Sequence, residues 1–167
     1  MYWAGPSYVL GGSHALVVGG EVIEVHQEQA ADPQLRGPTI AHATIRVEHV
    51  FADVPPVPRA GSPAQRYAGE PRIRFDGADG LALGDHVIVF AESYDGGYGI
   101  VPKQGTGVQV GIRVADWSDP IVAAIRRMLA GTADLRSPVD AEPWRRYGEE
   151  AIACVLEGVP HGHCGVD

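Results

Sequence analysis

The fold is decided by the stretch from Ser13 to His26, which reads SHALVVGGEVIEVH. It is long, mostly apolar and rich in β-branched residues, with Gly19 and Gly20 at its centre. Glycine inside a strand marks a bulge, a sharp bend or a close approach of another backbone. A long first strand that bends at glycines can pair with different neighbours before and after the bend, and small curved barrels begin in this way. We therefore expect a strongly curved barrel.

The length of the chain, 167 residues, suits one domain with a substantial core. A chain of about 150 residues buries roughly 70% of its unfolded surface. The 22 glycines and 13 prolines indicate many turns and tight loops, because long apolar runs survive between them. We expect a single domain over 1–167, with the barrel at about 13–114, a helical part at about 118–158 and a tail at 159–167.

Further strands are predicted where apolar and β-branched residues lie between turn residues. Alternation along 40–51 places Ala43 and Ile45 on one face and Thr44 and Arg46 on the other. The segment 86–91 is almost entirely apolar, which favours a central position in the sheet. The remaining strands are expected at 72–76, at 98–102 and within 104–114.

Two helices are expected after the strands. Asp119 followed by Pro120 is a typical helix start, and Gly131 ends the apolar periodicity that follows. A second helix is predicted at about 141–157, with Trp144 in its buried stripe. The predicted fold is a five-to-six-stranded curved antiparallel barrel followed by two C-terminal helices.

This order of elements resembles an OB-fold, and more narrowly the netrin-like domains, a group that includes the tissue inhibitors of metalloproteases. The matching stretches are Ala15–Val25, 43–50 (ATIRVEHV), 83–91 (LGDHVIVFA) and 97–99 (GYG), about half the chain. The resemblance implies an OB-like fold and, loosely, a binding role. The inhibitors carry an N-terminal cysteine and several disulfides, whereas both cysteines here follow residue 150. Protease inhibition is therefore not implied.

The net charge of −8 argues against general nucleic-acid binding, because that binding needs cations along a phosphate backbone. The first residues, MYWAGP, have neither the basic nor the apolar region of a signal peptide, and no apolar run approaches the ~20 residues of a membrane span. We expect a soluble, cytoplasmic protein, or an extracytoplasmic one if a signal peptide has been removed. Lys103 is the only lysine, which indicates the coding bias of a GC-rich bacterium.

The proline-rich loop 54–71 is the most unusual segment, because repeated prolines hold a chain extended. It is either a plain excursion between strands or a stiff arm that docks on a partner. Arginines gather in and just after it, and they form either a solvated face or a dock for an anionic partner. The candidate binding residues are these arginines and three aromatic residues: Arg59, Arg66, Arg72, Arg74, Tyr94, Tyr98 and Trp117.

The tail offers a candidate metal site in His161, His163 and Cys164. Imidazole and thiolate are good ligands for zinc or copper, although a structural zinc site takes a fourth ligand. The alternatives are a solvated tail and a disulfide between Cys154 and Cys164 in an oxidising compartment. No other cofactor is expected.

No catalytic motif of a hydrolase, nucleotide-binding enzyme or metalloprotease is present in the sequence. His86 follows Asp85, but adjacent strand residues point apart. The first hypothesis is a non-enzymatic module that binds another protein through strands two and three and the loop 54–71. The second is a metal-binding protein that uses the tail, and the third is an enzyme with a diffuse acid–base site.

Overall fold

The computed structural model describes most of the predicted barrel and the first part of the helical region. The described residues are 16–28, 40–53, 67–76, 78, 80–94, 97–100, 112–134 and 136–147. The proline-rich part of the loop at 54–66, the segment 101–111 and the chain after 147 lie outside them. The tail and both cysteines therefore also lie outside the described residues.

Six strands and a short helical region make up the described structure. The strands are β1 (Leu16–Glu28), β2 (Ile40–Asp53), β3 (Arg72–Asp76), β4 (His86–Tyr94), β5 (Gly97–Ile100) and β6 (Ile112–Val114). The helices are α2 (Pro120–Leu129), α3 (Pro138–Ala141) and the 3₁₀ helix η1 (Glu142–Tyr147). The predicted class, mainly β with two C-terminal helices, is confirmed. The strands predicted at roughly 15–26, 40–51, 72–76, 86–91 and 98–102 begin within one residue of these starts, whereas the last, predicted within 104–114, covers only Ile112–Val114.

The paired strands form a curved, barrel-like sheet. They run from β1 through β2, β3, β5 and β4, and β4 pairs again with β1. The pairings are antiparallel except for one short parallel contact between β3 and β5, which joins Phe75 to Tyr98 and Asp76 to Gly99. This parallel contact departs from the all-antiparallel prediction. β4 also pairs with β6 and therefore has three neighbours, which agrees with the central position that its apolar sequence predicted.

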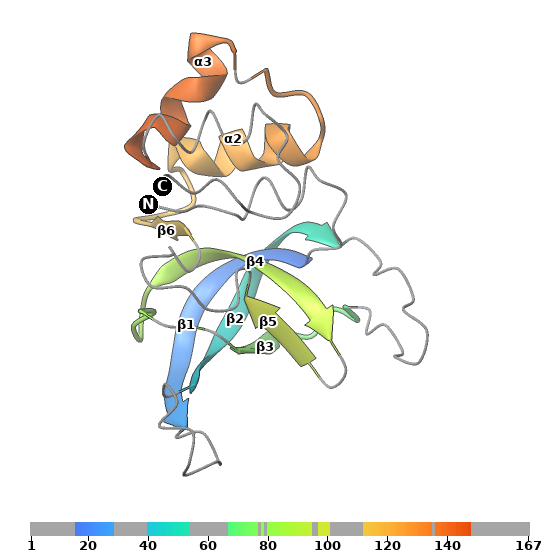
Figure 1. Ribbon diagram of the computed structural model, residues 1–167, viewed down its shortest axis with the longest axis vertical. Coiled ribbons are helices and arrows are strands. Elements are labelled where there is room, and N and C mark those ends of the chain that lie inside the picture. The colour runs from blue at the N-terminus through green and yellow to red at the C-terminus, as the bar shows by residue number, and fades with distance from the viewer. Residues whose placement is uncertain are drawn as a thin grey trace, which may run out of the picture.

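β1 is strongly curved (Figure 1), and the register of its pairing with β2 shifts between Gly19 and Gly20, where other groups occupy the space that a side chain would need. A Cβ atom on Gly20 would lie 2.0 Å from the backbone oxygen of Arg46, and one on Gly19 would lie 2.8 Å from the ring of Trp117. Residues 16–21 of β1 pair with β4, while β1 pairs with β2 along its length. Because they have no side chains, Gly19 and Gly20 let β1 lie close to β2 while it also pairs with β4.

Two buried clusters lie on opposite sides of β4, because successive strand residues point to opposite faces. Val87, Val89 and Ala91 belong to the cluster inside the barrel, together with Phe75. Ile88 and Phe90 belong to a second cluster, which joins the outer side of β1, β4 and β6 to the helices. Figure 1 shows α2 and α3 gathered on this side, above β4 and β6.

Helix α2 begins as predicted, since the side chain of Asp119 accepts a hydrogen bond from the N–H of Ile121 at 3.0 Å. The second helix differs from the prediction. It starts at Pro138, three residues early, and becomes a 3₁₀ helix from Glu142. Pro143 lacks the N–H that an α-helix would need at this point. Trp144 is buried as predicted.

Among the described residues, no helix is long and apolar enough to span a membrane.

Candidate functional site

The outer face of β1, β2 and β3 carries charged side chains in cross-strand rows. One row joins Glu24 on β1, Thr44 on β2 and Arg74 on β3. The neighbouring row joins Glu21, Arg46 and Arg72. Within these two rows the carboxylates lie on β1 and the arginines on β2 and β3, so the charge changes from negative to positive along each row.

The acidic end of this face is held by hydrogen bonds around Glu24. Its carboxylate lies 2.7 Å from Nε2 of His26 and accepts a hydrogen bond from the hydroxyl of Thr44 at 3.1 Å. These contacts, that of His26 first, lower the pKa of Glu24 below its ordinary value, and the charge of Arg74 lowers it further. Glu24 is therefore an anion at neutral pH.

The basic end of the face lies on a part of β3 that pairs with β2 alone among the described strands. The β2–β3 pairing joins residues 42–46 to 72–76, but β5 pairs only with Phe75 and Asp76 of β3. Among the described strands, none pairs with the edge of Arg72–Arg74 that faces away from β2. Both arginines are exposed, whereas Ile73 between them is buried in the barrel. The edge of a strand can act as a template for another extended chain.

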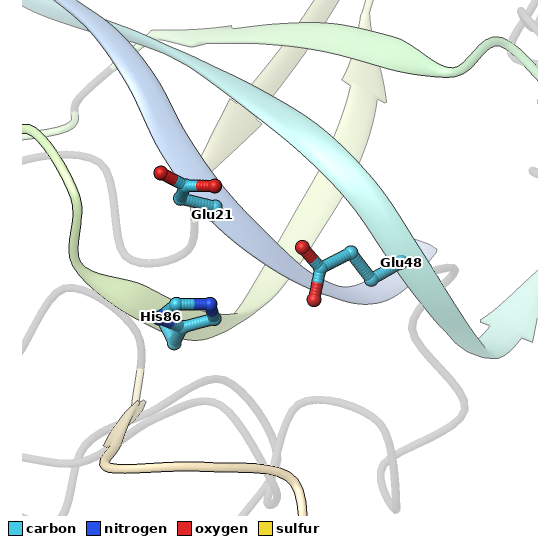
Figure 2. A group of neighbouring side chains, drawn as sticks. All are labelled: Glu21, Glu48 and His86. Atoms are coloured by element: carbon cyan, nitrogen blue, oxygen red, sulfur yellow. The ribbon is translucent and has the colours of Figure 1, made fainter.

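A second group of polar side chains lies where β1, β2 and β4 meet. Glu21, Glu48 and His86 each offer one ligand atom, and these atoms lie within 4.8 Å of one another. Figure 2 shows the three side chains converging from their three strands. Glu21 and His86 are direct cross-strand partners. We call these three residues the Glu–Glu–His cluster.

Glu48 reaches the cluster through a β-bulge. Gly19 pairs with His49 and Gly20 with Val47, so the register passes over Glu48. A bulge redirects the side chain of its extra residue and often lies next to a functional site. The bulge also reverses the alternation of β2, which places His49 on the same face as Arg46. Regular alternation would have placed His42 and His49 on opposite faces.

Trp117 and Arg46 hold the carboxylates of the cluster. The indole N–H of Trp117 donates to Oε2 of Glu48 at 2.6 Å. Its ring meets the imidazole of His86 edge to face, with centroids 5.9 Å apart. The guanidinium of Arg46 forms an ion pair with Glu21 and lies 3.6 Å from Oε1 of Glu48. The cluster is therefore a partly exposed network of hydrogen bonds and ion pairs.

Asp85, next to His86, belongs to the turn before β4 and not to a catalytic pair. Its carboxylate accepts hydrogen bonds from Nε of Arg113 and from the N–H of Ala82, both at 2.9 Å. The Arg113 hydrogen bond is the largest influence on the pKa of Asp85 and lowers it. Partial burial raises this pKa, and the Ala82 hydrogen bond lowers it again.

We expect the stability of the Asp85→Asn variant to depend less on pH in the acidic range than the stability of the wild type does. The folded-state pKa of Asp85 is below its unfolded value, so its stabilising effect is complete above the unfolded pKa and is lost as pH falls through the folded pKa. Between about pH 5 and pH 3, the melting temperature should fall less in the variant than in the wild type. Glu142→Gln is the control, because that side chain is 73% exposed. An equal fall in wild type and Asp85→Asn would contradict the prediction.

The residues predicted to bind a partner fall into three groups. Arg72 and Arg74 are exposed on β3, and Trp117 is half-buried against the outer helical cluster. Tyr98 is only 5% exposed, because its ring packs inside the barrel near Phe75, and it is therefore a core residue. Outside the described part lie Arg59, Arg66, the side chain of Tyr94, and the predicted metal ligands His161, His163 and Cys164.

The Glu–Glu–His cluster was not predicted from the sequence, since its members are far apart along the chain. The glycine pair was the available signal, because it marks the point where the strands approach closely. Comparison of the sequence with protein-family models and with curated proteins finds no match.

Proposed function

We propose that this protein is a non-enzymatic binding module with an OB-like barrel, and that it binds an extended, acidic segment of another protein along the edge of β3. The observation that carries the proposal is the pair of exposed arginines, Arg72 and Arg74, on a stretch of β3 whose side away from β2 pairs with no described strand. An added strand would take main-chain hydrogen bonds from this edge, and its acidic side chains would meet the arginines.

The strand order supports the OB-like assignment. An OB-fold is a five-stranded, partly open barrel that binds its ligands on the face of strands two and three. Among the described residues, β3 and β5 share two pairs, fewer than any other neighbouring strands around the sheet. The opening therefore lies beside β3. We also propose, on the basis of the sequence, that the fold is similar to the netrin-like group of OB domains.

The charge distribution favours an acidic partner bound at one side of the face. Arg72 and Arg74 lie on β3, whereas Glu21 and Glu24 lie two strands away on β1, roughly 10 Å across the sheet. An acidic chain at the β3 edge is thus attracted by the near arginines and kept away from β1. The overall charge of −8 repels long polyanions, so we expect a short protein segment and not a nucleic acid.

The test uses a labelled peptide of alternating glutamate and threonine, which is acidic and favours an extended strand. We expect it to bind the wild type, and the double variant Arg72→Glu/Arg74→Glu to bind it at least about tenfold more weakly, or ~1.4 kcal/mol. Binding of the peptide should also slow amide exchange along β3.

The matched control is Arg136→Glu, which reverses an exposed arginine far from β3 and should leave the affinity unchanged. A lysine–threonine peptide should bind weakly. The proposal fails if the double variant keeps wild-type affinity. It also fails if oligo(dT) binds more tightly than the acidic peptide through the same arginines, since that result would identify a nucleic-acid module.

A further inference from the structure

We propose that Glu21, Glu48 and His86 form a binding site for a divalent first-row transition-metal ion such as zinc. The three side chains supply two carboxylate oxygens and one imidazole nitrogen from three strands, and they converge on one point (Figure 2). Zinc accepts both kinds of donor. Calcium and magnesium take oxygen ligands, so the imidazole disfavours them.

The backbone already brings these ligands together. Glu21 and His86 face each other across the β1–β4 pairing, where directly opposite Cβ atoms lie about 4.5–5.5 Å apart. The bulge at Glu48 directs the third side chain toward them from β2. The strand register thus positions Glu21 and His86, and the β-bulge positions Glu48.

Only small movements of the side chains are needed to close the site. The ligand atoms lie within 4.8 Å of one another. An ion about 2.0–2.2 Å from each nitrogen and oxygen holds its ligands about 3–4 Å apart, so they must approach by roughly 1 Å. The side chains of Glu21 and Glu48 are 29% and 28% exposed, which leaves them room to rotate. Water can fill the remaining positions around the ion.

Trp117 supplies the outer contact that a metal-binding carboxylate requires. Its indole N–H holds Oε2 of Glu48 at 2.6 Å and leaves Oε1 for the ion. Such outer hydrogen bonds orient metal ligands and raise their affinity. The ring of Trp117 also lies beside His86, so its fluorescence should report an ion bound there.

Arg46 acts as the competing cation. It forms ion pairs with both carboxylates, and an incoming metal ion has to displace it. Its side chain is 52% exposed, so the guanidinium can move into solvent. Removal of this charge should therefore strengthen metal binding, whereas it would weaken a network whose only role is structural.

The experiment measures zinc binding by titration calorimetry on the untagged full chain. The tail ligands are replaced in every sample (His161→Ala, His163→Ala, Cys164→Ser), so that only the cluster is measured. We expect one equivalent of zinc to bind, and His86→Gln and Glu48→Gln each to weaken binding at least tenfold. Arg46→Gln should strengthen binding about tenfold, and calcium should not compete.

A second readout follows tryptophan fluorescence during addition of copper. We expect quenching in the chain with the replaced tail, and its loss when that chain also carries Trp117→Phe or His86→Gln. Melting temperatures in the absence of metal identify any variant that fails to fold, and Glu48→Gln replaces His86→Gln in that case. The proposal is overturned if zinc affinity is unchanged in the folded ligand variants, if calcium binds as tightly as zinc, or if Arg46→Gln weakens binding.

Discussion

Replacement of Gly20 by alanine is expected to lower the free energy of unfolding by about 3 kcal/mol, the upper part of the range for overpacked sites. A Cβ atom at this position would lie 2.0 Å from the backbone oxygen of Arg46. Backbone cannot move aside as the end of a flexible side chain can, so β1 and β2 would have to separate at the bend. For a chain of this size the melting temperature should fall by roughly 6–12 °C.

The matched control for this prediction is Gly131→Ala. Gly131 has a φ of +69°, and a Cβ there would meet nothing within 4 Å. This change carries only the backbone cost of a left-handed conformation, about 1–2 kcal/mol. Chemical denaturation of both variants separates the steric cost from the conformational one. If Gly20→Ala costs no more than Gly131→Ala, close strand approach does not determine the bend.

Phe90→Ala is expected to lower the free energy of unfolding by about 3–5 kcal/mol, through lost burial and the cavity that remains. Phe90 is 2% exposed and belongs to the cluster that joins β4 to α2 and Trp144. Since β4 is buried on both faces, this cluster should unfold together with the barrel. Circular dichroism and tryptophan fluorescence should therefore give one coincident transition, at a lower denaturant concentration than in the wild type.

Leu83→Ala is the control for Phe90→Ala. This side chain is of comparable hydrophobicity but is 72% exposed, so its loss should change stability by no more than about 0.5 kcal/mol. Two separate transitions in Phe90→Ala would show that the helical layer and the barrel are independent units. That outcome would contradict the expectation of a single domain.

The fold was largely predictable because its main signals are local. The glycine pair marked a place in β1 where the register shifts, the alternation along β2 identified its buried face, and the apolar sequence of β4 indicated a central position in the sheet. Asp119 and Pro120 located the start of α2. Each of these signals depends on residues within one element, so no knowledge of the pairing was needed.

The site was less predictable because it depends on register. The bulge at Glu48 interrupts an alternation that looks regular in the sequence, and nothing local distinguishes Glu48 from Arg46. The pairing of Glu21 with His86 joins residues from strands far apart in the chain. Tyr98 illustrates the same difficulty. Its parallel pairing with Phe75 places its ring in the barrel, whereas an aromatic residue after a turn suggested an exposed anchor.

The double pairing of β1 also has a consequence for synthesis of the protein. Leu16 pairs with Ala91, about 75 residues later, so the first strand is made long before its second neighbour exists. At 5–20 residues per second, the nascent chain waits roughly 4–15 s for β4. During that interval one edge of residues 16–21 lacks its strand partner, and an apolar edge of this kind can pair with other chains.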